Sequence, residues 1–311
     1  MGVLSICNSM LLGGGCSVSL KFPVRNRLPI GASNRPNSSA VIQLHQFKRG
    51  SFRNTRLRAT EERKDLQSAL WIMEGIYVIW LFILPYAPGD PVWAISGETI
   101  DSLIGLSLNF FFILPLLNSV GISTIQYPVL HPASEGLFNF VIGWTLMFGP
   151  LLFSDRKRGR FEGSLDLLWG GQMFLTNAFL IPYMAIRQRG NESGRSSSKL
   201  QALMTKGASA VGWVGGGVCV VSVLWVLFGR GEGGFGGLGE RLDYLVGYVG
   251  SERLAYAFVW DICLYCVFQP WLIGDNLQNV ERTKIHFVRR ARFVPVFGLL
   301  AYLLCLDFRP E

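Results

Sequence analysis

Asp261 is the residue whose chemistry and position attract attention first, because it is a carboxylate inside an apolar stretch. It lies between Trp260 and Ile262, in a segment long enough to cross a bilayer. An ionised carboxylate inside a bilayer is costly unless it is paired or hydrated, so such residues often mark ion or proton paths. The structural alternative is a protonated or hydrogen-bonded Asp that holds helices together. The sequence leaves both interpretations open.

Other polar residues interrupt the apolar stretches. Glu74 comes one turn into the first of them, near the expected interface, where water can hydrate it. The amides Asn109, Asn139, Gln172, Asn177 and Gln269 have interhelical hydrogen bonding as their default role. The candidate residues of an intramembrane polar site are Asp261, Gln269, Glu74, Asn109, Asn139 and Asn177.

Catalytic and metal-binding patterns are weak. After residue 60 the chain has only two histidines, His131 and His286, so neither a His-rich di-iron cluster nor an H-E-x-x-H zinc site can be built. Cys263 and Cys266 form a C-x-x-C spacing without a second pair, which is a weak metal or redox signal. We therefore predict no catalytic and no metal residues, and the sequence indicates no particular cofactor.

Seven apolar stretches must position these residues. About 20 mainly apolar residues in helical form cross a bilayer, since every peptide group is then satisfied within the segment. The last stretch is short and needs residues 288–292 to span. The sequence predicts an all-α protein, a polytopic transmembrane bundle of six to seven helices, from residues 69–86, 103–120, 137–154, 165–186, 210–228, 254–273 and 293–306.

A repeated motif favours an internal duplication. Residues 148–155 and 268–275 share F-x-P-x-L-x-x-D at an offset of 120. The bundle could then contain two inverted three-helix repeats, as in many transporters, with Pro150 and Pro270 equivalent. The plain interpretation of Asp155 and Asp275 is a solvated helix end, and an inverted arrangement places them on opposite surfaces.

The first 59 residues differ from the rest of the chain in charge. They carry nine Lys or Arg and no Asp or Glu, with Ser and Gly spread through them. This composition is typical of a plastid transit peptide, and Leu57-Arg58-Ala59 resembles a plastid processing site. We expect residues 1–59 to be a disordered chloroplast transit peptide and residues 60–311 to be the transmembrane helical domain, in the thylakoid or the inner envelope.

Removing the predicted transit peptide also removes the basic charge. The formal net charge of +8 becomes about −1, because 20 basic and 21 acidic residues follow residue 59. A nucleic-acid partner needs a concentrated basic face, so we predict none. The predicted partners are the lipid bilayer and other proteins of a membrane complex.

Loop charges give a small contrast between the two sides of the predicted bundle. With the mature amino terminus in the stroma, that side carries twelve Lys or Arg and the opposite side carries eight. The positive-inside rule favours this orientation. The basic run Arg156–Arg160 falls on the less basic side, which indicates that one segment is re-entrant or interfacial.

Two blocks carry a resemblance to a known family. They are Met73-Glu74-Gly75-Ile76-Tyr77 through Phe82-Ile83-Leu84-Pro85-Tyr86-Ala87-Pro88-Gly89-Asp90-Pro91, and Ser134-Glu135-Gly136-Leu137-Phe138-Asn139-Phe140. Over roughly residues 65–307 the chain resembles uncharacterised polytopic membrane proteins shared by plant plastids and cyanobacteria. The resemblance implies a plastid address and contributes no catalytic residue. A weaker similarity at Phe258–Asp261 is to the plastid neoxanthin synthase family, whose nearby His is absent here.

Three functions fit these observations. A non-catalytic scaffold or assembly component of a plastid membrane is favoured by the lack of catalytic motifs. The alternative is a small-solute or ion transporter, favoured by Asp261, the proline-containing helices and the repeat. The third is a lipid- or carotenoid-acting membrane enzyme, which follows from the weaker resemblance.

Overall fold

The computed structural model describes residues 61–122, 129–161, 163–188, 199–231 and 234–307. The predicted transit peptide, residues 1–59, lies outside them. The chain separates into Met1–Thr55 and Arg56–Glu311, and every described residue belongs to the second unit. The described residues are helical, with turns and one isolated β-bridge between Val280 and Leu306.

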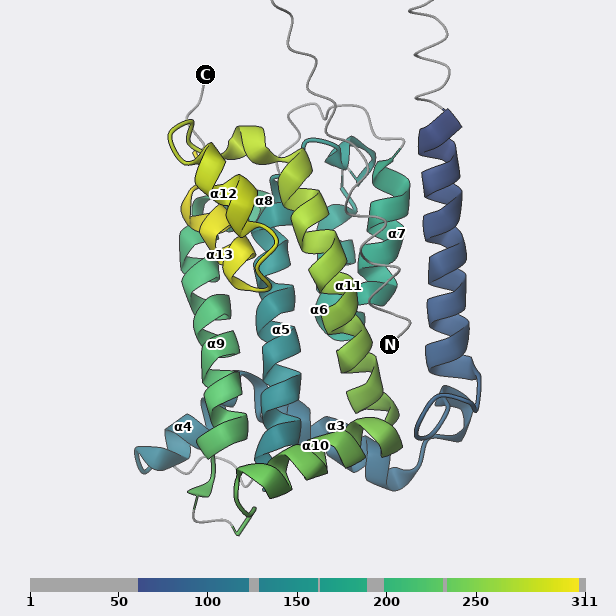
Figure 1. Cartoon of the computed structure of the whole chain (residues 1–311), viewed down its shortest axis with the longest axis vertical. Coiled ribbons are helices and arrows are strands. Elements are labelled where there is room, and N and C mark those ends of the chain that lie inside the picture. Colours follow the sequence, from purple (N-terminus) through teal and green to yellow (C-terminus); the bar gives the residue numbers. More distant parts are fainter. Residues whose placement is uncertain (1–60, 123–128, 162, 189–198, 232–233, 308–311) are drawn as a thin grey trace, which may run out of the picture. The chain divides into compact units, whose positions relative to one another are not determined.

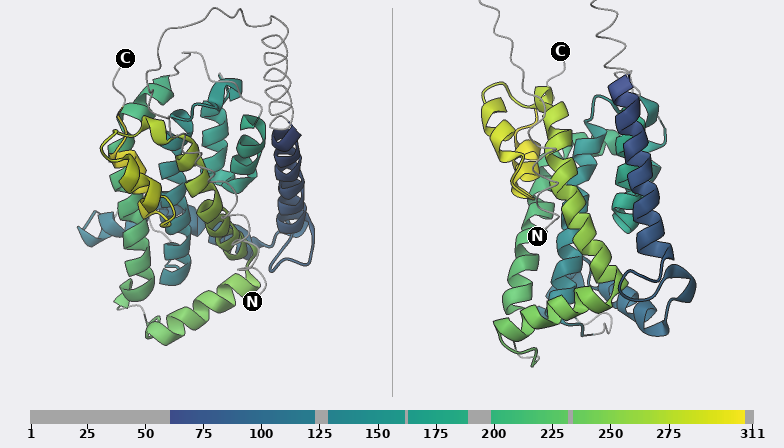
Figure 2. Two further views of the ribbon diagram at one scale, coloured as in Figure 1. Left: turned by 45° about the horizontal axis from the view of Figure 1, so that its top comes forward. Right: turned by 45° about the vertical axis from the view of Figure 1, so that its right-hand side comes forward.

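Figures 1 and 2 show the arrangement of the described α-helices. The first helix is Glu61–Ile83, whose last turn, Ile79–Ile83, is a π turn. The others are α3 (Gly97–Leu108), α4 (Ile113–Ser119), α5 (Pro132–Phe153), α6 (Leu165–Leu175), α7 (Asn177–Arg187), α8 (Lys199–Lys206), α9 (Ala208–Phe228), α10 (Leu238–Ser251), α11 (Arg253–Asp275), α12 (Ile285–Ala291) and α13 (Phe297–Leu304).

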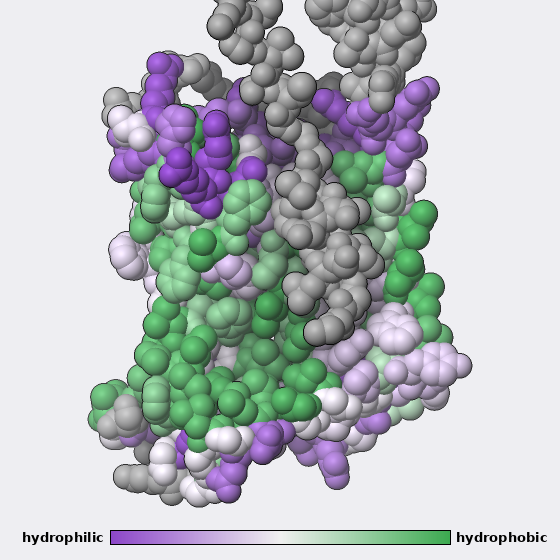
Figure 3. All heavy atoms as spheres, viewed as in Figure 1, coloured by the Kyte–Doolittle hydropathy of each residue, from purple (hydrophilic) through white to green (hydrophobic). Residues whose placement is uncertain are grey.

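The helices form a bundle whose two ends we name after buried acids. The Glu135 end holds the starts of α5 and α11, and the Asp155 end holds their last residues (Figure 1). Between the ends, the face in Figure 3 is largely hydrophobic. Five described helices are long and apolar enough to cross a membrane: Glu61–Ile83, Gly97–Asn118, α5, α9 and α11. The chain is thus membrane-embedded and in contact with lipid, with fewer candidate spans than the six to seven predicted.

Helix α5 is the core of the bundle. Its sequence favours a helix start at Pro132, because proline fits the first helical position and the His131 side chain accepts a hydrogen bond from the Ala133 N–H at 3.1 Å. Within α5, 78% of the most apolar 18 residues are buried. Helix α9 packs directly on it, since the carbonyl oxygen of Gly143 lies 2.7 Å from where a Cβ on Gly215 would be. Small residues permit this close backbone approach.

The glycines of α9 give a matched stability test. A side chain at Gly215 would collide with Gly143 and with Met147, whereas one at Gly217 meets nothing within 4 Å. We expect Gly215→Leu to lower the free energy of unfolding by about 1–3 kcal/mol, the usual cost of overpacking. Gly217→Leu should leave the unfolding temperature of the detergent-solubilised protein unchanged. Equal unfolding temperatures for the two variants would contradict the α5–α9 contact.

The second predicted segment, 103–120, is broken. Phe111 and Phe112 have φ of 53° and 56°, values that non-glycine residues rarely adopt. Helices α3 and α4 on either side of this break lie across the Glu135 end rather than along α5 (Figures 1 and 2). Gly97–Asn118 is therefore long and apolar enough to cross a membrane, but it does not form one straight helix.

The fourth predicted segment, 165–186, is a helical hairpin rather than one crossing. Thr176 separates α6 from α7 with φ 41° and ψ −108°. A Cβ on Gly171 would meet the ring of Phe179 at 2.6 Å, although a continuous helix would hold these residues about 12 Å apart. Each arm has 11 residues, or about 16 Å, which is half a bilayer core. The hairpin enters and leaves at the Asp155 end, so the predicted crossing is wrong.

The last predicted segment, 293–306, also does not span. Helix α13 has only eight residues, about 12 Å. It pairs with α12 in a second hairpin, with Val296 at φ 61° in the turn. The Gln269 side chain donates hydrogen bonds to the carbonyl oxygens of Arg292 and Val294, each at 2.9 Å. These bonds pair two carbonyl oxygens of the non-helical turn, and unpaired backbone groups are costly inside a membrane.

The repeated motif marks two parallel helices. Residues 120 apart face each other along α5 and α11: Thr145 and Tyr265 share a 2.6 Å hydrogen bond, and the rings of Phe138 and Phe258 lie 5.8 Å apart. Both motifs end at the Asp155 end. An inverted relationship between these two segments is therefore wrong, because it would place the motif ends on opposite surfaces.

The two hairpins change the charge distribution between the ends. At the Glu135 end the described basic residues are Arg230, Arg241 and Arg253. The other described Lys and Arg belong to segments that lie toward the Asp155 end in Figure 1: the start of the first helix, the segment after α5, the end of α7, α8, and the segment from the end of α11 to the turn after α12. The basic run Arg156–Arg160 therefore joins the basic side. The weak contrast expected from seven crossings becomes a strong one once segment 165–186 returns to the side it left.

Candidate intramembrane polar site

Asp261 is buried between three helical elements. Its side chain is on α11, and the residue is 1% exposed. The Tyr77 hydroxyl of the first helix donates a hydrogen bond to its Oδ1 at 3.0 Å, and the Asn177 amide donates to the same oxygen at 2.7 Å. Asn177 also donates to the main-chain carbonyl of Asp261 at 3.3 Å. Two residues predicted as site members, Asp261 and Asn177, are thus in direct contact.

The apex of the α6–α7 hairpin delivers Asn177 to this carboxylate. Asn177 is the first residue of α7, so the positive end of the helix dipole lies beside Asp261. The backbone turns back at Thr176, whose N–H donates to the Gln172 carbonyl oxygen at 2.8 Å. Broken helices with their ends at the centre of a membrane are the usual means of building an ion or solute site there.

Several buried polar atoms around the apex have no hydrogen-bond partner. Gln172, one turn before Thr176, is fully buried with both amide atoms unpaired, and the Asn177 Oδ1 is also unpaired. On the first helix the Glu74 Oε2 is buried and unpaired, one turn from Tyr77. Buried polar atoms are nearly always hydrogen-bonded in proteins. This concentration of unpaired oxygens suits a bound polar species.

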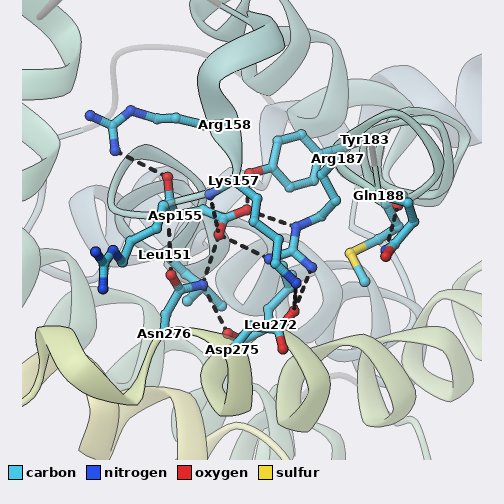
Figure 4. A network of polar contacts seen from close by, with 12 residues as sticks. Leu151, Asp155, Lys157, Arg158, Tyr183, Arg187, Gln188, Leu272, Asp275 and Asn276 are labelled. Carbon is cyan, nitrogen blue, oxygen red and sulfur yellow. Dashed lines mark hydrogen bonds and ion pairs between the residues drawn. The ribbon is translucent and has the colours of Figure 1, made fainter. Parts of the chain in front are cut away.

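A second polar cluster, drawn in Figure 4, lies at the Asp155 end. Arg187, the last residue of α7, donates to both carboxylate oxygens of Asp155, from Nε at 2.8 Å and Nη2 at 2.9 Å. It also donates from Nη1 to Asp275 at 2.9 Å. Asp275 accepts a further bond from the Lys157 ammonium at 2.9 Å. Asp155 and Asp275, predicted as solvated ends, instead share one buried arginine.

Asp155 has its acceptor capacity filled. Beside Arg187, the Tyr183 hydroxyl, the Asn276 amide and the Lys157 N–H all donate to it, at 2.5, 3.0 and 3.2 Å. Burial raises the pKa of Asp155, but the bonds and charge of Arg187 more than offset that effect and hold the pKa below its ordinary value. We infer a structural role: the cluster clamps the hairpin to α5 and α11.

A third cluster surrounds Glu135 at the opposite end. The buried Glu135 carboxylate accepts bonds from Arg230 at 2.7 and 2.9 Å, from the Trp225 indole at 2.8 Å and from the Asn109 amide at 2.7 Å. Asn139, one turn along α5, accepts a bond from the N–H of Phe111 at 2.6 Å. The cluster therefore holds the unusual backbone at residues 110–112, and its carboxylate is fully paired.

Asp261 differs from these other buried acids in its partners. Asp155 pairs with Arg187, and Glu135 pairs with Arg230. The donors to Asp261 among the described residues are neutral: the Tyr77 hydroxyl, the Asn177 amide and the Thr176 hydroxyl. No known protein family, curated protein or solved structure matches the chain. This difference in charge pairing sets Asp261 apart from the two structural clusters.

The six predicted site residues occupy four places. Asp261 and Asn177 meet at the hairpin apex, and Glu74 lies on the same helix as their partner Tyr77. Asn109 and Asn139 belong to the Glu135 cluster. The remaining residue, Gln269, accepts a bond from the Trp144 indole at 2.9 Å and holds the α12–α13 turn, so it has a structural role.

Two further members of these clusters, Tyr77 and Arg187, could not be recognised from the sequence. Tyr77 resembles an ordinary interfacial aromatic, and only its position one turn after Glu74 links it to the buried face. Arg187 directly follows the apolar stretch 165–186, a position that in sequence indicates an ordinary loop charge. The signal for the hairpin was Gly170-Gly171 followed by Thr176-Asn177, because small and polar residues in mid-segment favour a break. Within the described residues, no three His, Cys, Asp or Glu side chains gather as possible metal ligands.

Proposed function

We propose that this protein is a membrane carrier for protons or small cations, with Asp261 as the coupling group. The observation that carries the proposal is that the buried Asp261 carboxyl group has no ion pair with a described basic side chain. A carboxylate in such a place becomes neutral by taking up a proton, or its charge is balanced by a bound cation. The apex of a broken helix, with unpaired amide oxygens nearby, supports the same function.

Protonation of Asp261 changes which bonds the hairpin apex can make. The ionised carboxylate accepts bonds from Asn177 Nδ2 and Tyr77, as observed. A protonated carboxyl becomes a donor, and turning over the Asn177 amide, whose Nδ2 now contacts the carboxylate, would present its unpaired Oδ1 as the acceptor. Binding or release of a proton, or exchange with a cation, is thereby linked to the orientation of Asn177 and hence to the α6–α7 hairpin.

Reconstitution of the purified chain into liposomes tests this function. A pH-sensitive dye inside the vesicles reports proton movement after a pH step, in the presence of sodium, potassium or only a large organic cation. We expect the gradient to collapse faster with protein than in protein-free vesicles, and the cation series identifies any coupled ion. Equal rates under every condition would contradict the carrier proposal.

A non-catalytic scaffold is the second candidate, and specific surfaces favour it. The first helix exposes Trp71, Ile72 and Ile76, and α9 exposes Trp213 and Phe228. Such large apolar side chains suit lipid or the helices of another membrane protein. Stable co-purification of stoichiometric membrane subunits, together with absent flux, would favour the scaffold over the carrier.

We also propose a plastid membrane as the location, supported by the basic, acid-free segment 1–59 and by the resemblance to plastid and cyanobacterial membrane proteins. The basic Asp155 end then faces the stroma under the positive-inside rule. A lipid- or carotenoid-acting enzyme ranks third, since the resemblance at Phe258–Asp261 is its sole support.

A further inference from the structure

An arginine cluster on the α12–α13 hairpin has no carboxylates of its own. Arg289 and Arg290 are exposed on α12, and Arg292 follows in the turn. Among the described residues none of the three has an ion pair within 4.0 Å. The negative charge of Asp275 attracts Arg292, but the Asp275 carboxylate already accepts hydrogen bonds from Arg187 and Lys157. The hairpin therefore presents positive charge that the protein does not neutralise.

Arg292 is held where an anion would be favourable. Its guanidinium lies 4.6 Å from the ring centre of Phe293, and its Nε is buried without a hydrogen-bond partner. Burial and the charge of neighbouring Arg289 both lower the pKa of Arg292. Two nearby guanidiniums repel each other unless an anion lies between them.

Large apolar side chains adjoin these arginines. Phe287, Phe293, Val294 and Phe297 are 48–60% exposed on the same hairpin. Figure 3 shows hydrophilic residues over α12 directly above hydrophobic surface. Cationic groups next to exposed aromatic side chains at the end of a membrane bundle match a lipid with an anionic headgroup and apolar chains.

We propose that the α12–α13 hairpin is a binding site for an anionic phospholipid of the leaflet at the Asp155 end. Arg289 and Arg292 bind the phosphate, and Phe293 and Phe297 contact the acyl chains. The charge pattern favours a lipid over a free anion, because the cluster adjoins an exposed apolar surface rather than a closed polar pocket. This site lies on different helices from Asp261, so it is independent of the carrier proposal.

Native mass spectrometry of the full chain in neutral detergent tests the site. The probes are phosphatidylglycerol, phosphatidylcholine with the same acyl chains, and inorganic phosphate. We expect one phosphatidylglycerol to remain bound under conditions that strip phosphatidylcholine. The double variant Arg289→Gln/Arg292→Gln should weaken phosphatidylglycerol binding about 25-fold, taking about fivefold for each arginine near an anionic surface.

The matched control is Lys206→Gln, which removes an exposed cation on α8 at the same end. Its phosphatidylglycerol affinity should stay within about twofold of the wild-type value, and the unfolding temperature of each variant verifies folding. Equal binding of the two lipids, or unchanged affinity in the folded double variant, would overturn the proposal. Displacement of phosphatidylglycerol by equimolar inorganic phosphate would also overturn it, by showing that the ligand is a free anion.

Discussion

Replacing Arg187 with Gln is expected to lower the free energy of unfolding by about 3–5 kcal/mol, the cost of leaving a buried charge unpaired. Asp155 and Arg187 are both fully buried, and their pairing is bidentate. Gln keeps some hydrogen-bonding capacity but supplies no charge. Thermal unfolding of the detergent-solubilised protein, followed by tryptophan fluorescence, measures the effect.

Lys157→Gln is the matched control for this variant. Lys157 also pairs with an aspartate at 2.9 Å, but its side chain is 38% exposed. Exposed pairs contribute only about 0–1 kcal/mol, so the control should unfold near the wild-type temperature. If the two variants lose the same stability, the Asp155 cluster is not the buried clamp that the distances indicate.

The clamp also predicts a pH dependence. The pKa of Asp155 in the folded protein is below its ordinary value, so the ionised form stabilises the fold. This contribution is fully present above the unfolded pKa, about pH 4, and is lost as the pH falls through the lower folded pKa. The wild-type unfolding temperature should therefore fall below about pH 4. That fall should be smaller in Arg187→Gln.

Asp261→Asn is expected to reduce flux in liposomes to the protein-free background while the protein remains folded. The amide keeps the size of the side chain and one acceptor for Tyr77 and Asn177, but it cannot ionise. Asp261→Leu should in addition lower stability, because it leaves those two buried donors unpaired at about 1–3 kcal/mol each. The dye assay and the unfolding temperature separate the two effects.

Asp275→Asn is the control for Asp261→Asn, since it makes the same charge change on the same helix. Arg187 keeps its bidentate partner Asp155 in this variant, and the proposed coupling site is unaltered. Flux should persist. A folded Asp261→Asn protein with wild-type flux would leave the scaffold as the better function.

Much of the fold follows from local sequence. The apolar stretches at 137–154, 210–228 and 254–273 became α5, α9 and α11, because their length and hydropathy specify a membrane helix without long-range information. Asp261 was identified for the same reason, since a carboxylate in such a stretch is conspicuous. Those properties do not reveal the direction in which a segment leaves the membrane.

The re-entrant hairpins depended on information that hydropathy lacks. A single backbone reversal at Thr176 divides the mainly apolar stretch 165–186 into two half-length arms, and the average hydropathy is the same either way. The unexplained basic run Arg156–Arg160 was the available clue, because it conflicted with seven crossings. The partner of Asp261 could not be predicted, as Asn177 reaches it only through that reversal.

The course of residues 165–187 is the most direct test of the account, since one crossing there would move Asn177 away from Asp261. Single cysteines replace exposed Ser164, Lys199 and Asp243 in a chain whose native cysteines are changed to Ala. A membrane-impermeant maleimide is then applied to sealed vesicles of known orientation. We expect Ser164→Cys and Lys199→Cys to react from the same side, and Asp243→Cys on α10 from the other. Reaction of the first two from opposite sides would contradict the hairpin and the site that depends on it.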